Sequence, residues 1–380
     1  MAKRQVAAGL KDAAGPKSRL LSGHAGDADP AVSQPNDVLS KRRPTMTDVA
    51  RIAGVSQSSV SMVLNQMTGA RISAATGSRV RDVAAQIGYI LPGQRRVDRL
   101  TPNRTIAYLV DEISTSPHPV INLDGARDAA WDCGILVAAH VTRSNQHLET
   151  ATIESIKRDQ SVIGIIYSTI ITRRLAIAPE IGDVPTVLLN CYTDDRRLNA
   201  VVPSEVAGAF TATRHLLELG HRRIAFINGE PWMDASRDRL KGFRQALATA
   251  DIAMDPRMAR NGDWLPLSGY MLTRELLGDS VRPSAVFCAN DLMAIGALEA
   301  ASELGLRVPE EVSIMGYDDQ ELARYTHPPL STLVLPNYEM GRRAVELLID
   351  IAVHGKDMRP MTFKIDGPLV ERASVGPVAV

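Results

Sequence analysis

Residues 47–66 read Thr47-Asp48-Val49-Ala50-Arg51-Ile52-Ala53-Gly54-Val55-Ser56-Gln57-Ser58-Ser59-Val60-Ser61-Met62-Val63-Leu64-Asn65-Gln66. Apolar residues recur at helical spacing up to Gly54, which ends the first helical pattern because glycine adopts positive φ angles without strain. Ser56 is suited to cap a second helix, whose apolar face includes Val60 and Leu64. The stretch therefore predicts two short helices joined by a tight turn.

The second predicted helix carries no charged residue between its apolar positions. These intervening residues are Gln57, Ser58, Ser59, Ser61, Met62 and Asn65. Short polar side chains on a helix that follows a glycine turn suit a reader of base edges in the DNA major groove. An ordinary pair of core helices is the alternative. The compact spacing, the cap and the uncharged face together favour a DNA-binding helix-turn-helix.

The charge of the chain is zero in sum but unevenly distributed. Residues 1–105 contain sixteen Lys or Arg, seven Asp and no Glu, which gives a net charge of +9. Because the whole chain has 43 basic and 43 acidic residues, the remainder carries −9. A basic N-terminal part followed by an acidic remainder is typical of a protein in which only the basic part contacts the phosphates of a nucleic acid.

The cysteines and the apolar runs exclude several other classes of protein. The three cysteines, Cys133, Cys191 and Cys288, are far apart and lack metal-ligand spacing, so we expect small buried hydrophobes and no metal or cofactor. No run approaches the roughly 18 apolar residues that a membrane span needs. The N-terminal stretch is charged and lacks an apolar core, so we expect no secretory signal and a cytoplasmic protein.

The composition divides the chain into four parts. Residues 1–43 lack a sustained apolar period and predict a disordered basic extension. Residues 44–90 predict the helical DNA-binding headpiece, and residues 91–105, with two prolines and four arginines, predict a hinge linker. Residues 106–380 alternate between short β-branched runs and amphipathic helices, which indicates mostly parallel sheets covered on both faces. Because this part is long for one sheet, we expect two sheets with a cleft between them.

The predicted strands and helices of this last part alternate along most of its length. The strand candidates are 106–110, 135–141, 162–167, 186–189, 223–227, 285–288 and 312–316. The helix candidates lie near 121–132, 147–159, 205–219, 236–250, 267–277, 291–304 and 337–353.

Polar residues follow most of the predicted strands. In open α/β sheets, ligands bind beyond the carboxyl ends of the strands. The residues found there, together with one aromatic loop residue, are Asp111, Asn190, Arg237, Asn290, Asp318 and Trp264. Carboxylates, amides and a guanidinium suit the hydroxyls of a polyhydroxylated ligand, and an aromatic ring suits the apolar face of a pyranose.

Each of these residues also has a purely structural interpretation. Asn290 and Asp291 could cap the helix 291–304, and Trp264 could be plain packing. Catalysis is disfavoured, because the chain contains no dinucleotide-binding glycine motif, no Walker A motif, no nucleophile elbow and no HExxH. A solute-binding protein of the same two-lobed fold would need an export signal and no headpiece, whereas this sequence shows the reverse.

These motifs, in this order, resemble the lactose-repressor/galactose-repressor (LacI/GalR) family of bacterial transcription regulators over about residues 44–372. Besides the helix-turn-helix, the resemblance rests on Glu218-Leu219-Gly220-His221-Arg222-Arg223-Ile224-Ala225-Phe226-Ile227, Pro283-Ser284-Ala285-Val286-Phe287-Cys288-Ala289-Asn290-Asp291, Gly305-Leu306-Arg307-Val308-Pro309, Gly316-Tyr317-Asp318-Asp319, Pro328-Pro329-Leu330-Ser331-Thr332 and Met340-Gly341.

The resemblance implies a homodimer whose paired headpieces bind a pseudo-palindromic double-stranded operator. Behind them it implies a two-lobed, periplasmic-binding-protein-like domain, with two doubly wound parallel sheets, that closes on a small effector. The effector is usually a sugar or a sugar derivative. The implied function is a transcriptional regulator, in most cases a repressor, whose operator affinity changes when the effector binds.

The resemblance also implies roles for individual residues. Base edges would be met by Gln57, Ser58 and Met62, and the DNA backbone by Thr45, Ser61 and Asn65. The effector would be bound by Arg237, Asn290 and Asp318, in a pocket that is also lined by Asp111, Asn190 and Trp264.

The sequence departs from the family pattern at several places. In the recognition helix, Met62 stands where the family usually carries an Arg, and the turn Met67-Thr68-Gly69-Ala70-Arg71 that follows is about two residues longer than usual. The Asp-Asn pair that precedes the lobe-crossing helix is replaced by Pro203-Ser204. In the linker, Asp98 occupies the position of a leucine that inserts into the minor groove, and a carboxylate cannot act as an apolar wedge between base steps. Either Leu100 is the wedge in a shifted hinge, or no wedge inserts and Arg95, Arg96 and Arg99 hold the linker to phosphate and the narrow groove.

The second alternative is favoured, because Pro92-Gly93 and Thr101-Pro102 leave barely two turns of helix between them. On this interpretation Leu100→Ala changes operator affinity and DNA bending little. Replacing Arg95 and Arg96 together by Ala weakens binding and flattens its salt dependence, because fewer counterions are released. Gel-shift and bending assays test this, and a loss of bending in Leu100→Ala at unchanged oligomeric state would establish the shifted wedge.

Overall fold

The computed structural model describes residues 46–55, 60, 63–64, 73–87, 89, 104–175, 181–195, 197–355 and 359–378. The chain forms two compact units, residues 1–91 and residues 92–380. Each unit is described by itself.

The first unit contains the helices α1 (Met46–Ala53) and α3 (Ala74–Gln86). Gly54 follows α1 with φ = 64°, the positive value expected for the turn. Ser73 caps α3 by accepting a hydrogen bond from the Thr76 N–H at 3.1 Å. The core of the unit consists of Val49, Ala50, Ala53, Val60, Leu64, Val80, Val83, Ala84 and Tyr89. The predicted apolar face of the second helix is therefore buried at Val60 and Leu64.

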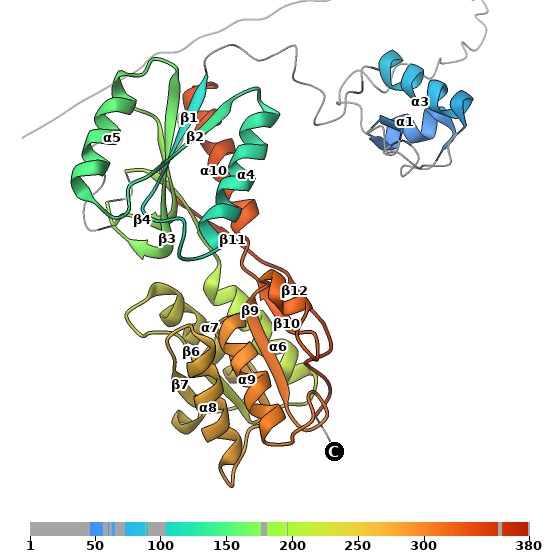
Figure 1. The fold of residues 1–380 in the computed structure, drawn as a ribbon, viewed down its shortest axis with the longest axis vertical. Coiled ribbons are helices and arrows are strands. Elements are labelled where there is room, and N and C mark those ends of the chain that lie inside the picture. The colour runs from blue at the N-terminus through green and yellow to red at the C-terminus, as the bar shows by residue number, and fades with distance from the viewer. Residues whose placement is uncertain are drawn as a thin grey trace, which may run out of the picture. The chain divides into compact units, whose positions relative to one another are not determined.

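The second unit has two lobes, each built on a six-stranded sheet (Figure 1). The sheet of the first lobe is parallel throughout and has the order β11-β5-β4-β3-β1-β2. Its strands are β1 (Thr105–Val110), β2 (Leu136–Val141), β3 (Val162–Arg174), β4 (Thr186–Tyr192), β5 (Asn199–Pro203) and β11 (Thr362–Ile365). The helices of this lobe are α4 (His118–Asp132), α5 (Gln146–Arg158) and α10 (Asn337–Ala352).

Alternate residues of the first-lobe strands face two separate cores. Ile106 and Tyr108 of β1 pack with α4 and α10, whereas Ala107 and Leu109 pack with α5. Successive side chains of β1 thus alternate between two apolar cores, as a strand buried on both faces requires.

The sheet of the second lobe has the order β12-β10-β9-β8-β6-β7 and is parallel except for β12, which runs antiparallel to β10. Its strands are β6 (Ile224–Asn228), β7 (Ala259–Asn261), β8 (Ala285–Cys288), β9 (Ser313–Asp318), β10 (Ser331–Val334) and β12 (Leu369–Val370). The helices α6 (Glu205–Glu218) and α7 (Asp234–Thr249) pack together, as do α8 (Pro266–Gly278) and α9 (Asp291–Glu303).

The described chain crosses between the lobes three times, after β5, after β10 and between β11 and β12. The crossings are bonded to one another. The Ser204 N–H donates to the Ile365 carbonyl at 2.9 Å, and the Val334 N–H donates to the Pro368 carbonyl at 2.9 Å. A Cβ on Gly367 would lie 1.8 Å from the Val334 oxygen, so these two crossings are in direct backbone contact.

The predicted fold class is confirmed, and each of the seven predicted strands and seven predicted helices is present within a few residues, except that the strand predicted at 162–167 extends to Arg174. The prediction missed β5, β7, β10, β11 and β12, each of which has five residues or fewer. The expectation that all three cysteines are buried is wrong for Cys133, which is exposed at the end of α4. Within the described residues, no helix has the length and apolar character that a membrane span needs.

The helices α4 and α10 approach each other through two glycines. A Cβ on Gly125 would lie 2.0 Å from the Tyr338 oxygen, and a Cβ on Gly341 would lie 1.9 Å from the Asn122 oxygen. Both obstacles are backbone atoms, which cannot rotate away. Glycine at both positions is therefore what lets these helices pack this closely.

We expect Gly341→Ala to destabilise the second unit by about 1–3 kcal/mol or more, because the added methyl group forces the two helices apart. Gly278→Ala is the matched control, since no atom lies within 4 Å of the position of its Cβ. Urea unfolding followed by tryptophan fluorescence measures both, because all three tryptophans lie in this unit. Equal stability of the two variants would contradict the close packing.

Candidate functional site

A cavity of about 300 Å³ lies between the two lobes. Its walls come from the loop before α4, from β3 and β4, from the starts of α6, α7, α9 and α10, and from the loops after β7 and β9. The polar and aromatic residues among its lining are Thr115, Ser116, His118, Thr172, Asn190, Glu205, Arg239, Trp264, Asn290, Asp318, Gln320 and Asn337. This inter-lobe cavity contains four of the six predicted effector residues: Asn190, Trp264, Asn290 and Asp318.

Arg239 and Glu205 form a buried ion pair at the wall of the cavity. The Arg239 Nε donates to Glu205 Oε2 at 2.7 Å, and NH2 donates to Glu205 Oε1 at 2.9 Å. Both side chains are only 4% exposed. NH1 donates to the Ala289 carbonyl and lies 3.5 Å from Asp318 Oδ1, while the guanidinium carbon lies 3.7 Å from the centre of the Tyr317 ring.

The surroundings of Arg239 keep its guanidinium charged. Burial alone would lower the pKa of Arg239, but the charge of Glu205, with that of Asp318, raises it above its ordinary value. The same burial and the charge of Glu205 raise the pKa of the Tyr317 hydroxyl, so this group stays protonated. The cation is thus fixed in place by a carboxylate, a carbonyl and a ring face.

Arg237, which we predicted to bind the effector, lies outside this cavity. Its side chain is 57% exposed, pairs with Asp234 and donates to the Trp232 carbonyl at 2.7 Å. It lines a neighbouring cavity of about 460 Å³ together with Asp234 and Lys364. The reason is helical geometry: the buried face of α7 includes Ser236, Arg239 and Phe243, and Arg237 lies off that face.

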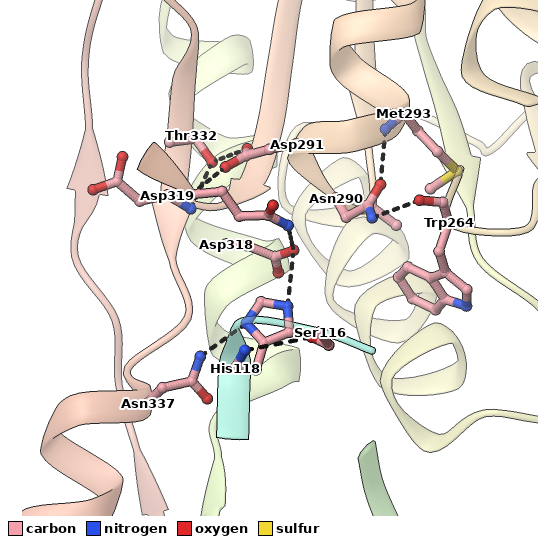
Figure 2. Close-up of polar contacts among 12 residues, drawn as sticks. Ser116, His118, Trp264, Asn290, Asp291, Met293, Asp318, Asp319, Thr332 and Asn337 are labelled. Carbon is pink, nitrogen blue, oxygen red and sulfur yellow. Dashed lines mark hydrogen bonds and ion pairs between the residues drawn. The ribbon is translucent and has the colours of Figure 1, made fainter. Parts of the chain in front are cut away.

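Asp318 joins the two lobes at the cavity (Figure 2). His118, at the start of α4 in the first lobe, places Nε2 3.6 Å from Asp318 Oδ2. The side chain of Gln320 donates to the same oxygen at 3.2 Å. Burial raises the pKa of Asp318, whereas the facing His118 and Arg239 oppose this shift. Asp318 was predicted from the sequence, whereas His118 was not.

His118 is held by groups of its own lobe. Its Nδ1 lies 3.0 Å from Asn337 Nδ2, and its backbone N–H donates to Ser116 Oγ at 3.4 Å (Figure 2). With Nδ1 accepting from the Asn337 amide, the ring proton resides on Nε2 and faces Asp318.

Trp264 and Asn290 form one structural unit on the second-lobe side (Figure 2). Asn290 caps α9 by accepting from the Met293 N–H at 2.9 Å, and its Nδ2 donates to the Trp264 carbonyl at 2.9 Å. The capping interpretation of Asn290 is therefore confirmed, and its amide also positions the tryptophan. The indole N–H of Trp264 donates to the weakly accepting sulfur of Met233 at 2.9 Å.

Asn190 and Asp111 have different surroundings. Asp111 directly follows β1, whereas the strand expected to end before Asn190 continues to Tyr192, so Asn190 lies within β4. Asn190 lines the cavity, accepts from Thr172 Oγ1 and donates to the Thr169 carbonyl at 3.0 Å. Asp111 is not among the residues that line this cavity. Its carboxylate accepts from the Ile170 N–H at 2.8 Å and lies 3.0 Å from Arg173, so it holds the long strand β3 in place. Burial raises the pKa of Asp111.

Three cavity residues have strained backbones. Asn190, Trp264 and Asp318 have φ angles of 59°, 69° and 114°, in the region that favours glycine. Residues held in such conformations cluster at ligand sites, because the surrounding structure must impose them. Within the described residues, no group of three or more His, Cys, Asp or Glu could hold a metal ion.

The predicted DNA-binding residues lie outside the described residues. These are Thr45, Gln57, Ser58, Ser61, Met62, Asn65, Arg95 and Arg96. Their roles stay predictions.

Comparison with known proteins decides the family. Residues 45–91 match the bacterial regulatory proteins of the lacI family, and residues 213–375 match the periplasmic binding protein-like domain. The transcriptional repressor CytR of Escherichia coli K12 is 33% identical over 330 residues, which cover 87% of this chain and 96% of CytR. The chain belongs to the LacI family. It is a helix-turn-helix transcriptional repressor with an effector-binding domain, and its relatives are repressors rather than enzymes.

Solved structures of LacI-family regulators share the fold. The complex of the regulator CelR with cellobiose is 30% identical, with a TM-score of 0.60 over 87% of this chain and 100% of CelR. The Lac repressor dimer bound to operator and the anti-inducer ONPF is 27% identical, with a TM-score of 0.61 over 88% of this chain and 100% of that chain.

The difference between the buried Arg239 and the exposed Arg237 can be measured through the free energy of unfolding of their variants. We expect Arg239→Met to destabilise the second unit by about 3–5 kcal/mol, because it leaves the Glu205 charge buried without a partner. Arg237→Met should change stability by less than about 1 kcal/mol, because it removes an exposed pair. Adding Glu205→Gln to Arg239→Met should restore part of the loss. Urea unfolding gives these values, and equal losses for the two single variants would refute the buried role of Arg239.

Proposed function

We propose that a sugar or sugar derivative binds in the inter-lobe cavity and controls the affinity of this repressor for its operator. The observation that carries the proposal is the lining of the cavity, which combines hydrogen-bonding groups from both lobes with the indole ring of Trp264. A pyranose has hydroxyls at its rim and an apolar face, and it matches such a lining. The cellobiose complex of CelR supports this class of ligand.

Individual residues then take separate roles. Asp318 accepts ligand hydroxyls, because its carboxylate has acceptor capacity beyond its contacts with Gln320 and Arg239. Asn190 adds an amide from the first lobe, and Trp264 covers the apolar face of the ring. Asn290 acts through Trp264, since both ends of its amide are already bonded.

The coupling to DNA follows from the position of the ligand between the lobes. Besides the pair of His118 with Asp318, the Tyr192 hydroxyl of the first lobe donates to Asp234 Oδ2 of the second lobe at 2.8 Å. Burial, and then this hydrogen bond, raise the pKa of Tyr192 to about 12, so the hydroxyl keeps its proton. A ligand that contacts both lobes favours the lobe arrangement it fits best, and the same arrangement sets operator affinity.

The DNA-binding roles complete the proposal. Residues 44–90 are the headpiece, in which Gln57, Ser58 and Met62 meet base edges and Thr45, Ser61 and Asn65 meet the DNA backbone. The linker 91–105 carries Arg95 and Arg96 to the phosphates. Because operator DNA is its partner, we place the protein in the cytoplasm.

We also propose that the repressor is a homodimer, as the Lac repressor structure is. On α8, Leu267 and Met271 lie one turn apart and are 66% and 60% exposed, an apolar surface suited to a second copy. Sedimentation at micromolar concentration should give a dimer, and Met271→Asp should weaken it. A monomeric wild-type protein would contradict this proposal.

The effector site is tested by two variants with opposite expectations. A screen of sugars by calorimetry identifies a ligand. Asp318→Asn should weaken its binding by roughly 30-fold or more, because a buried charge that bonds the ligand is lost. Arg237→Ala should change its affinity less than about threefold. Fluorescence anisotropy with the promoter should show that both variants bind operator and that only Asp318→Asn loses its response to the sugar. Unchanged sugar affinity in Asp318→Asn would refute the site.

A further inference from the structure

Arg239 has little hydrogen-bonding capacity left for a ligand. Two of its nitrogens donate to Glu205 at 2.7 and 2.9 Å. The third nitrogen donates to the Ala289 carbonyl and lies 3.5 Å from Asp318. The face of the guanidinium is covered by Tyr317. A guanidinium binds phosphate or carboxylate through two parallel N–H groups, and here Glu205 already occupies that pair.

The charged residues that line the cavity also disfavour an anionic ligand. Among the described residues that line the cavity, Arg239 is the only Lys or Arg, and it is accompanied by the two carboxylates of Glu205 and Asp318. The side chains of all three are 4% exposed, so water screens their charges little. Protonation of Asp318 would remove one negative charge but would release no cation, because Arg239 would stay paired with Glu205.

The two carboxylates leave the cavity with unused hydrogen-bond acceptors. Asp318 and Glu205 carry four carboxylate oxygens with lone pairs beyond the contacts described above. A ligand that donates hydrogen bonds, such as a hydroxyl or an ammonium group, satisfies them. An added phosphate or carboxylate would be buried beside like charges without a free cation, which is strongly unfavourable.

We propose that Glu205 makes this repressor selective against anionic effectors, so that the inter-lobe cavity accepts neutral or cationic hydrogen-bond donors and rejects phosphorylated or carboxylated ones. This deepens the proposed function and rests on the cavity being the effector site. Glu205 is the specificity-determining residue, because it neutralises the guanidinium that would otherwise receive an anionic group. Its position at the start of α6 follows the departure of Pro203-Ser204 from the family pattern.

The test compares neutral probes with charged ones of the same shape. The probes are D-ribose with ribose 5-phosphate, D-glucose with glucose 6-phosphate and with glucosamine, and inorganic phosphate alone. Calorimetry and the fluorescence of Trp264, in a background of Trp131→Phe and Trp232→Phe, report binding. We expect each phosphate ester to bind the wild-type protein at least a hundredfold more weakly than its parent sugar, where that sugar binds. Inorganic phosphate should not bind measurably.

Two variants distinguish the effect of the pairing between Arg239 and Glu205 from the effect of the net charge of the cavity. Glu205→Gln and Asp318→Asn each remove one negative charge, but only Glu205→Gln releases the guanidinium. Glu205→Gln should therefore gain at least tenfold in affinity for inorganic phosphate, and Asp318→Asn should gain less. Circular dichroism verifies that both variants are folded, and the comparison within the wild-type protein requires neither of them.

The outcomes are distinct. Tighter binding of a phosphate ester than of its parent sugar to the wild type overturns the proposal, as does an equal gain of phosphate affinity in the two variants or no gain in Glu205→Gln. If the wild type binds none of the sugars, the sugar class of the proposed function fails. Phosphate binding by Glu205→Gln alone would still support the exclusion of anions.

Discussion

The buried pair of Glu205 and Arg239 joins more of the second lobe than any other polar contact at the cavity. Glu205 begins α6, where the chain enters this lobe, and Arg239 lies on α7. Through Arg239 the pair reaches the end of β8 at Ala289 and the end of β9 at Asp318. A buried ion pair stabilises a fold only when its hydrogen bonds offset the loss of water, and here at least three charge-assisted bonds do so. The placement of the cavity wall depends on this pair, since it fixes two helices and two strand ends together.

The two sides of the cavity are organised differently. On the second-lobe side, polar groups largely bond one another, as in the chain from Met293 through Asn290 to Trp264. On the first-lobe side, His118 contacts Asp318 across the cavity at 3.6 Å, longer than a good hydrogen bond. The second lobe is thus a preformed surface, and the contact of His118 with Asp318 is weaker than the bonds within that surface. A ligand that replaces weak cross-lobe contacts with good ones has the differential affinity that a population shift requires.

Much of the fold could be predicted from the sequence, and the reasons are physical. Alternation of apolar runs with amphipathic helices located each buried strand of five or more residues except β5, which ends in Pro203 and resembles a turn. The other missed strands are short, and their stability comes from pairing with neighbours rather than from their own pattern. Asn190, Asn290 and Asp318 were predicted because parallel strands bring their carboxyl ends to one edge, and Trp264 was predicted as an aromatic loop residue.

The remaining site residues needed three-dimensional information or a closer use of periodicity. Arg239 could have been predicted, since its spacing from Ser236 and Phe243 places it on the buried face of α7. Arg237 was chosen instead from its place after a predicted strand and from its motif position. Glu205 was missed because β5, the strand that precedes it, was not predicted. His118 has no local pattern that separates it from a surface residue, because its partners, Asn337 and Asp318, are about 200 residues away in the sequence.

The three crossings between the lobes have a mechanical consequence. Since they are bonded side by side, through Ser204 to Ile365 and through Val334 to Pro368, they form one hydrogen-bonded strap rather than three separate tethers. A strap of this kind resists sliding and torsion and leaves bending as its soft direction. Lobe motion is then confined to nearly one coordinate, and different ligands can vary only how far the molecule bends along it. Agonists and antagonists of such a molecule would differ in degree along a single scale, not in the kind of shape they produce.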